Sequence, residues 1–228
     1  MEIAPDIHLI DGSVGCNTYL IVNADLTLVD TGLKGNVARI ERYLHKFDYK
    51  LTDIKRIVIT HAHIDHMNCL YQLKQETGAE VITGEHNADF VSGKKQVHKP
   101  RGIFGSVFGV VGIFYKYKPV PVDIELKDGA LVPGVQDYRA ISLPGHSEGN
   151  IGLYSPSRKI LFSSDSVRVI DGKVAPPNDK FTADMVEAVK SIKKMSELEF
   201  TVLLPGHGNP VMADAAVKIR QLCLEIKH

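Results

Sequence analysis

The chain has 228 residues, of which 44% are hydrophobic and 24% are charged. A chain of this length and composition buries roughly 70% or more of the surface that its unfolded state exposes, which excludes disordered and fibrous classes and removes the need for a disulfide scaffold. The 27 basic residues equal the 27 acidic ones, so no overall charge favours nucleic acid or an anionic membrane.

The cysteines and the N-terminus indicate the cellular compartment. Cys16, Cys69 and Cys223 have spacings that fit neither paired zinc-knuckle cysteines nor a disulfide framework, so we expect reduced thiols. Acidic residues precede any apolar run, unlike the basic start of a signal peptide. The longest apolar stretch, residues 102–115, is interrupted by Ser106 and several glycines and is shorter than the roughly 20 residues of a membrane-spanning helix. These features predict a cytoplasmic protein without a membrane span.

The N-terminal half is predicted to contain three strands, a helix, a further strand and a second helix, in that order. Strands are predicted at residues 7–10, 18–22, 26–29 and 54–60, between turn-forming residues. Apolar residues at three- and four-residue spacing predict a helix at 36–47. A second helix is predicted at 66–76, with Gly78 just past its end as a left-handed cap.

The C-terminal half repeats this order. Strands are predicted at residues 138–143, 151–154, 159–163 and 200–204, and helices at 182–195 and 213–226. Thr182 is the predicted N-cap of the first of these helices. Strand clusters that alternate with amphipathic helices predict α/β layers, and residues 1–228 are expected to form a single domain.

Four apolar runs each end within a few residues of a side chain that can bind a metal ion. Residues 57–60 precede His61-Ala62-His63-Ile64-Asp65-His66, residues 141–145 precede His146, residues 160–164 precede Asp165, and residues 202–206 precede His207. In layered α/β folds the loops beyond the carboxyl ends of buried strands build the functional face, so we expect these side chains to converge.

The types of these side chains point to a metal centre. Five histidines and two carboxylates are nitrogen and oxygen donors that zinc accepts, and seven donors exceed what one tetrahedral ion needs. Two ions roughly 3.5 to 4 Å apart that share a carboxylate and a water would use them all. His45, His86, His98 and His228 stand alone and receive no role, and Asp165 by itself could equally be a turn residue or a helix cap.

These motifs resemble the metallo-β-lactamase superfamily. The resemblance is carried by Thr60-His61-Ala62-His63-Ile64-Asp65-His66, Pro144-Gly145-His146-Ser147, Ser164-Asp165 and Pro205-Gly206-His207-Gly208, and is extended by Asn17-Thr18-Tyr19-Leu20 and Asp30-Thr31-Gly32. It implies an α/β fold of the four-layer αβ/βα sandwich type, with the site at one edge of two packed sheets.

The resemblance also implies roles for the seven residues. His61, His63 and His146 would hold the first metal, Asp65, His66 and His207 the second, and Asp165 would bridge both. The implied cofactors are two zinc ions per chain, with iron or manganese as alternatives. A water between the ions would have its pKa lowered toward about 7 and would attack as hydroxide, while the surplus positive charge stabilises an oxyanion. A metal-bound water or a carboxylate, Asp65 or Asp165, would return the proton to the leaving group.

Departures from relatives narrow the expected activity. A β-lactamase of the cysteine-ligand type would have cysteine where Asp165 stands. Glyoxalase II enzymes continue into a long C-terminal helical region, whereas this sequence ends at His228, shortly after His207. Asn68-Cys69 stand where relatives often carry glycine, which we expect to alter helix packing. The expected enzyme is a hydrolase that cleaves an ester, thioester or lactone of a small, partly apolar substrate.

Residues 92–118 are expected to form an insertion that covers the pocket. If residues 102–115 are helical, Phe104, Phe108 and Tyr115 line one face and would contact an apolar acyl or lactone portion of the substrate. The alternative is a buried helix or one that forms a homodimer. Arg168, shortly after Asp165, is either a further substrate contact or an exposed strand residue.

Other activities stay open at this stage. The basic run from Lys94 to Arg101 suggests a phosphodiesterase or nuclease, but the neutral chain and the lack of a long extra domain argue against nucleic acid as a partner. Persulfide dioxygenases share the fold and hold one iron with two histidines and an aspartate, so an oxidoreductase is a second possibility. A non-catalytic metal-binding module is the third.

Overall fold

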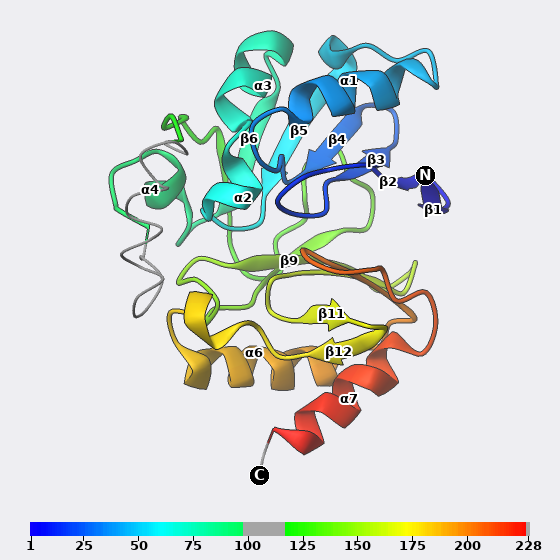
Figure 1. Cartoon of the computed structure of the whole chain (residues 1–228), viewed down its shortest axis with the longest axis vertical. Helices are drawn as coiled ribbons and strands as arrows, with labels where there is room; N and C mark the ends of the chain where they lie inside the picture. Colours follow the sequence, from blue (N-terminus) through cyan, green and yellow to red (C-terminus); the bar gives the residue numbers. More distant parts are fainter. Residues whose placement is uncertain (98–116, 227–228) are drawn as a thin grey trace.

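The computed structural model describes residues 1–97 and 117–226, and these form four stacked layers (Figure 1). Two layers are β-sheets that face each other, and helices cover the outer face of each sheet. The predicted four-layer α/β sandwich is therefore confirmed. Phe104, Phe108 and Tyr115, with most of the predicted insertion, lie outside the described residues.

The first sheet is mixed, and its strands follow chain order. Antiparallel pairing joins the first four strands, and parallel pairing joins the rest. The strands are β1 (Glu2–Ala4), β2 (Ile7–Leu9), β3 (Tyr19–Val22), β4 (Leu26–Val29), β5 (Ile54–Ile59), β6 (Glu80–Gly84) and β7 (Ile124–Leu126). The carboxyl ends of β4, β5 and β6 consequently lie at the same edge.

The second sheet has the order β13-β10-β9-β8, with β10 and β13 parallel. Its strands are β8 (Arg139–Ser142), β9 (Ile151–Ser155), β10 (Ile160–Ser164) and β13 (Val202–Pro205), and a separate hairpin is formed by β11 (Arg168–Ile170) and β12 (Lys173–Ala175). Parallel pairing of β10 and β13 brings Ser164 beside Pro205, so the residues that follow both strands emerge together.

Three hydrophobic cores separate the layers. Neighbouring residues of a strand point to opposite faces, so Ile57 packs toward helices above the first sheet while Val58 packs between the two sheets. Phe162 joins Val58 in the central core, and Leu161 faces the helices below the second sheet. Because both faces of the central strands are covered, these strands read as continuous apolar runs.

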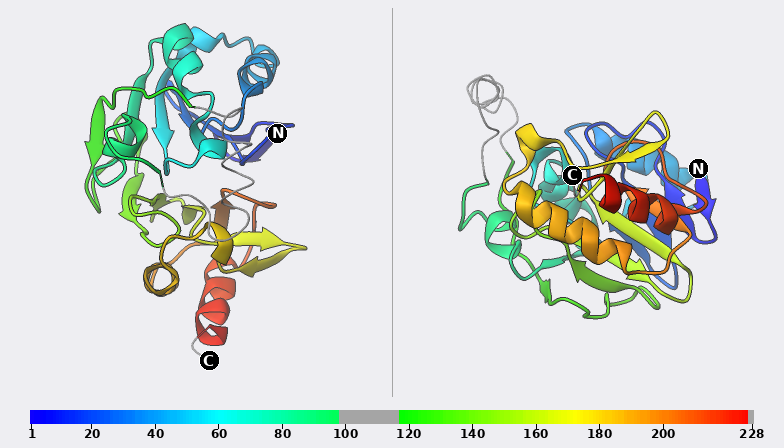
Figure 2. Two further views of the ribbon diagram at one scale, coloured as in Figure 1. Left: turned by 60° about the vertical axis from the view of Figure 1, so that its left-hand side comes forward. Right: turned by 90° about the horizontal axis from the view of Figure 1, so that it is seen from below.

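The helices lie on the outer faces of both sheets. Two views show α6 and α7 side by side under the second sheet (Figure 2). The helices are α1 (Asn36–His45), α2 (Ile64–Met67), α3 (Leu70–Thr77), α4 (Ala88–Val91), α6 (Met185–Ser196) and α7 (Ala215–Glu225), with short 3-10 turns η1 (Leu51–Asp53) and η2 (Asp179–Phe181). Within the described residues no helix is long and apolar enough to cross a membrane.

Two helix predictions need correction. The helix predicted at 66–76 is divided into α2 and α3, since the chain turns at Asn68 and Cys69. Gly78 does adopt the left-handed conformation, with φ 69°, that was predicted for the cap. Thr182 is not an N-cap: Asp184 fills that role for α6 and accepts hydrogen bonds from the backbone N–H groups of Val186 and Glu187.

Several strands in the described structure were not predicted. β1, β7, β11 and β12 have three residues each, which is too short for a period-two pattern to emerge. β6 contains only the apolar pair Val81 and Ile82 within its five residues. These elements owe their structure to pairing with neighbours rather than to a local pattern.

Gly145, next to a predicted ligand, gives a test of the packing of α6 against the second sheet. A Cβ at Gly145 would lie 2.1 Å from the backbone N of Ala188, and its φ is +127°. We expect Gly145→Ala to lower the free energy of unfolding by about 3 kcal/mol or more, measured by urea denaturation, because backbone must move. Gly129→Ala, at φ +79° with open space around it, should cost about 1–2 kcal/mol; equal losses would contradict this account.

Candidate metal centre

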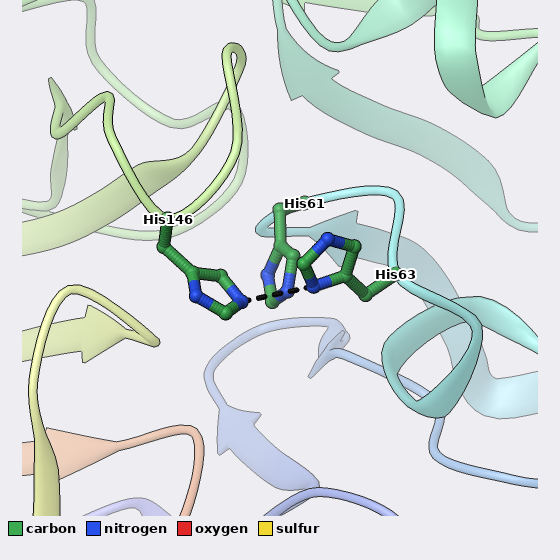
Figure 3. Close-up of side chains that lie close together, drawn as sticks. All are labelled: His61, His63 and His146. Carbon is green, nitrogen blue, oxygen red and sulfur yellow. Dashed lines mark hydrogen bonds between the residues drawn. The ribbon is translucent and has the colours of Figure 1, made fainter. Parts of the chain in front are cut away.

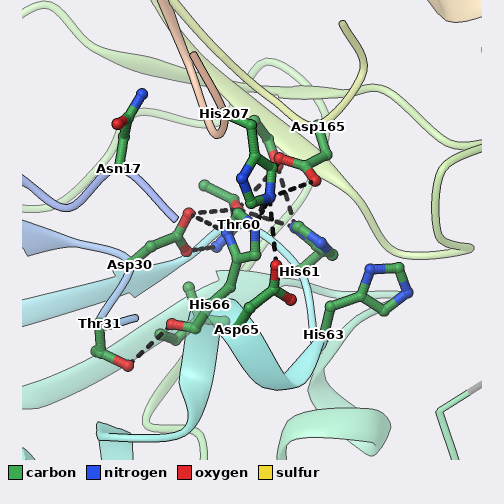
Figure 4. Close-up of polar contacts among 12 residues, drawn as sticks. Asn17, Asp30, Thr31, Thr60, His61, His63, Asp65, His66, Asp165 and His207 are labelled. Carbon is green, nitrogen blue, oxygen red and sulfur yellow. Dashed lines mark hydrogen bonds and ion pairs between the residues drawn. The ribbon is translucent and has the colours of Figure 1, made fainter. Parts of the chain in front are cut away.

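The four predicted strand ends meet at one edge of the sandwich. β5 is followed by His61 and His63 and then by α2, which carries Asp65 and His66, while β8 leads to His146, β10 to Asp165 and β13 to His207. The residues from the first half lie against those from the second half (Figure 4). All seven predicted ligands are thus brought together.

His61, His63 and His146 form a first group, with one ring nitrogen of each within 4.8 Å of the others. The rings of all three converge (Figure 3), and His63 Nδ1 lies 2.9 Å from His146 Nε2. His61 comes from the strand end, and His63 caps α2 as the extended residue before it. The extended backbone between them lets alternate side chains point to the same side.

Asp65, His66 and His207 form a second group within the same limit of 4.8 Å. His207 Nε2 lies 3.2 Å from Asp65 Oδ2 and 3.4 Å from His66 Nε2. Asp65 and His66 start from the short helix α2, and His207 from the turn after β13. The side chains of Asp65 and His207 are 33% and 37% exposed, so this group opens to solvent.

Asp165 lies between the two groups. Its Oδ1 is 3.4 Å from His66 Nε2, and its Oδ2 is 3.4 Å from His146 Nε2 and 3.2 Å from His207 Nε2. One carboxylate therefore faces ligands of both groups, which suits the bridging position expected from the sequence.

Hydrogen bonds hold three of the histidines in the orientation that a metal needs. His61 Nδ1 lies 3.1 Å from Ser164 Oγ, and His146 Nδ1 lies 3.4 Å from Thr182 Oγ1. Thr182 donates its own proton to the Asn178 carbonyl, so it accepts from His146. In a neutral ring, such a bond at the outer nitrogen leaves Nε2 as the lone pair that faces the centre.

Asp30 supplies the third such bond and was not predicted as part of the site. Its carboxylate accepts hydrogen bonds from His66 Nδ1 at 2.8 Å, from the Thr60 backbone N–H at 2.9 Å and from Thr60 Oγ1 at 2.8 Å. The sequence signal was present, because Asp30 directly follows the buried strand β4, as the other site residues follow theirs.

The donor atoms themselves fit a bound cation. His61 is fully buried, and its Nε2 has no hydrogen-bond partner among the described residues. Asp165 Oδ1 also forms no hydrogen bond there, although His66 Nε2 lies 3.4 Å away. Buried polar atoms without partners are costly, and nitrogen and carboxylate oxygen are ligands that zinc and related ions accept.

The histidines of the first group are neutral at pH 7. Burial lowers the pKa of His61 well below its ordinary value, and burial together with the charge of His146 lowers the pKa of His63 to about 3. Burial also lowers the pKa of His146. These rings are therefore uncharged, and a cation does not have to compete with an imidazolium proton there.

The second group is charged. Burial acts to lower the pKa of His207, but hydrogen bonds to Asp165 and Asp65 outweigh it and raise the pKa to about 9. Burial acts to raise the pKa values of both carboxyls, but His66 and His207 lower them below their ordinary range. The group thus holds protonated imidazole against ionised carboxylate.

His66 is protonated for a similar reason. Burial acts to lower the pKa of His66, but Cys16, Asp165 and Asp30 together raise it well above its ordinary value. Burial raises the pKa of the Cys16 thiol to about 11, so this thiol is uncharged at pH 7. The two carboxylates are consequently the groups that retain the proton on His66.

Gly206, the residue before His207, lets this histidine approach Asp165. A Cβ at Gly206 would lie 2.0 Å from Asp165 Oδ1 and 2.9 Å from His66 Cε1. Asn17, in the loop before β3, holds the same turn, since its Nδ2 donates to the carbonyls of Pro205 and Gly208 at 3.0 and 2.7 Å. The absence of a side chain at residue 206 therefore sets the position of the carboxylate.

Arg168 is the remaining predicted site residue within the described chain. It lies on β11, is partly buried, and its Nε donates to the Pro176 carbonyl at 3.1 Å. Within the described residues no hydrogen bond or ion pair joins Arg168 to the seven predicted ligands. Its role as a substrate contact stays a prediction.

The sequence profile of the metallo-beta-lactamase superfamily matches residues 11–207. The chain belongs to this superfamily. This superfamily member is similar to the "Probable metallo-hydrolase YqjP" of Bacillus subtilis, with 24% identity over 223 residues that cover 87% of the chain and 69% of YqjP. It is similar to a hydroxyacylglutathione hydrolase of Cereibacter sphaeroides, with 26% identity over 68% of the chain and 48% of that protein.

A solved structure shows the same fold. The metallo-beta-lactamase family protein TTHA1429 from Thermus thermophilus superposes with a TM-score of 0.77 at 20% identity, over 99% of this chain and 81% of that chain. The superfamily and the names of its relatives support a metallo-hydrolase, and the His and Asp groups described above could hold the metal.

Gly206→Ala tests the role of the turn in this superfamily member. We expect zinc affinity to fall on the order of 10–100-fold, because the added Cβ forces the Asp165 carboxylate away, while the free energy of unfolding changes little since a side-chain end can move. Competition titration against a chelating indicator and urea denaturation measure the two effects. Gly78→Ala, whose Cβ meets open space, should keep wild-type affinity; an equal loss there would contradict the argument.

The charge difference between the two groups predicts a pH dependence of metal loading. An ion at His66 and His207 must displace their protons, so its affinity should rise by up to about tenfold per pH unit for each proton as the pH increases from about 6.5 toward about 9. An ion at the neutral first group should bind with nearly constant affinity from about pH 7 to about pH 9. Zinc titrations across this range test the difference, and identical pH slopes for both ions would contradict it.

Proposed function

We propose that the protein is a dinuclear metal-dependent hydrolase that cleaves an ester, thioester or lactone of a small, partly apolar substrate. The observation that carries the proposal is the convergence of seven nitrogen and oxygen donors from four separate strand ends, with a carboxylate between the two groups. The likeness to proteins named as probable metallo-hydrolases supports the metal-dependent hydrolysis in this proposal.

The proposal assigns the ligands as the sequence did. His61, His63 and His146 would hold one ion, Asp65, His66 and His207 the other, and Asp165 would contact both. When bound, two zinc ions would supply Lewis acidity and a water of lowered pKa. Iron or manganese would suit the same donors.

The carboxylates of Asp65 and Asp165 are the groups proposed to move protons. Asp65 is the better placed of the two, because its side chain is 33% exposed whereas that of Asp165 is 11% exposed. In this proposal Asp65 Oδ2 accepts a proton from the water that attacks the carbonyl. It returns this proton to the leaving group, which is the alkoxide oxygen of an ester, the sulfur of a thioester or the ring oxygen of a lactone. Asp165, enclosed by histidines, keeps its charge.

A hollow beside the first group supports a partly apolar substrate. It is a shallow depression, partly open to solvent, that combines aliphatic and aromatic walls with two of the proposed ligands. Its lining residues are Ala62, His63, Asn87, Phe90, Val97, His146, Ser147, Glu148 and Ala183. A small acyl or lactone portion would rest on the apolar walls while its carbonyl points to the histidines.

A cytoplasmic location belongs to the same proposal, since three buried free cysteines suit a reducing compartment.

A specific arrangement favours a second candidate, a mononuclear iron oxidoreductase of the persulfide dioxygenase type. His61, His66 and Asp165 also form a group within 4.8 Å, and two histidines with one carboxylate are the ligand set of many non-haem iron oxygenases. Metal analysis of the purified protein separates the candidates: two zinc ions per chain support the hydrolase, and one iron supports the oxygenase.

Activity after metal removal tests the hydrolase directly. We expect chelator-treated protein to be inactive toward an aryl ester, a thioester and a lactone with apolar acyl groups, and zinc to restore at least one of these activities. In the restored enzyme Asp65→Asn should lower kcat by about 10²–10⁴-fold, as expected for loss of a general acid–base group.

One control variant and two further outcomes determine how that experiment is interpreted. His45→Ala, at the last turn of α1 away from the centre, should leave kcat and metal content unchanged. Turnover by metal-free protein would contradict the proposal, and a fully loaded protein that leaves all three substrates intact would favour a non-catalytic metal-binding module.

A further inference from the structure

Ser164 combines backbone strain with a buried hydroxyl at the end of β10. Its φ is +52°, in the left-handed region that glycine adopts freely and other residues rarely do. The strain accompanies a register shift in the pairing of β10 with β13 between Phe162 and Ser164. Glycine would satisfy this backbone better, so a serine here indicates that its side chain is used.

The hydroxyl of Ser164 connects three buried groups. Ser164 Oγ lies 2.7 Å from Asn150 Oδ1, 2.8 Å from Thr60 Oγ1 and 3.1 Å from His61 Nδ1. Ser164 is 3% exposed, and the side chains around it are as deeply buried. Because these groups are buried, each of their protons needs an acceptor within the network.

The directions of these hydrogen bonds are determined by their ends. Asp30 can only accept, so Thr60 donates its hydroxyl proton to Asp30 Oδ2. The Asn150 amide donates to the Leu143 carbonyl, so its Oδ1 is an acceptor. The single proton of Ser164 therefore goes to Asn150 or Thr60.

The same reasoning gives the proton position on His61. Since the hydroxyl proton of Ser164 is already donated, Ser164 Oγ can only accept from His61 Nδ1 at 3.1 Å, and Thr60 Oγ1, which lies 3.2 Å from the same nitrogen, can likewise only accept. A neutral imidazole carries one N–H, so His61 Nε2 is left as a lone pair, and this is the buried atom without a hydrogen-bond partner in the described structure.

We propose that Ser164 is a positioning residue: its hydroxyl fixes the His61 proton on Nδ1 and orients Nε2 toward a cation of the first group, at the expense of a strained backbone. The inference rests on the proposed metal-dependent function and extends it, because it assigns to Ser164 a role in metal affinity. It also explains why the strand that delivers Asp165 ends on a non-glycine residue with positive φ.

The test compares Ser164→Ala with Ser164→Gly. Both remove the hydroxyl, but only glycine relieves the backbone. We expect both variants to bind the first zinc about 10–100-fold more weakly than wild type, and to change the visible spectrum of the cobalt-substituted first site. The metal-free glycine variant should melt at a higher temperature than the metal-free alanine variant. A role in folding alone would lower the melting temperature without changing affinity or spectrum.

Lys159→Gly is the matched control. Lys159 precedes the other end of β10 with φ +53°, so glycine relieves similar strain away from the centre, and zinc affinity should stay at the wild-type value. Wild-type affinity in Ser164→Ala, or recovery of wild-type affinity in Ser164→Gly, would overturn the proposal for Ser164 alone. A wild-type protein that binds no metal would instead overturn the proposed function, and the role of Ser164 with it.

Discussion

The buried carboxylate of Asp30 is the interaction on which the arrangement of the centre depends. It is 2% exposed and accepts hydrogen bonds from the backbone and hydroxyl of Thr60 and from His66 Nδ1. Asp30 follows β4, Thr60 follows β5 and His66 belongs to α2, so one carboxylate joins the ends of two neighbouring strands to the helix that carries ligands. Each donor is required, because a buried carboxylate that loses one is left poorly compensated.

The centre around Asp30 brings together side chains whose close approach is unfavourable in the absence of a metal ion. His61 and His66 have ring centroids only 4.0 Å apart, and Asp65 and Asp165 keep their negative charges in a crowded, largely buried place. Protonated His66 and His207 offset those charges in the metal-free protein, but His61 Nε2 keeps no partner within the described residues. Departures of this kind from good polar pairing mark functional sites, where the rest of the fold provides the stability.

The strand ends and their ligands could be predicted because an apolar run followed by Pro-Gly-His or by clustered histidines is a local signal. Thr182 is a residue whose role the local pattern does not predict. The pattern suits an N-cap, but Asp184 caps α6 and the Thr182 hydroxyl lies beside His146. The role of Ser164 likewise depends on partners far away in the chain. Asp30 is intermediate, since an acidic residue directly after a buried strand follows the same rule as Asp165, but its partners lie on other elements. The local sequence pattern therefore identifies the ligands. The hydrogen bonds that fix the positions of their protons depend on tertiary structure, because the partners lie far apart in the sequence.

The division of ligands between the two halves of the chain links metal binding to packing. The first half provides His61 and His63 but needs His146, and it provides Asp65 and His66 but needs His207. Each of these groups therefore exists only when the two sheets pack in the correct register across the central core. A cation that binds the assembled groups and not the separated halves stabilises that packing by mass action. Metal binding and the docking of the two sheets are, for this reason, thermodynamically linked: a bound cation raises the free energy of unfolding of the packed sheets, because the unfolded chain does not hold the assembled groups.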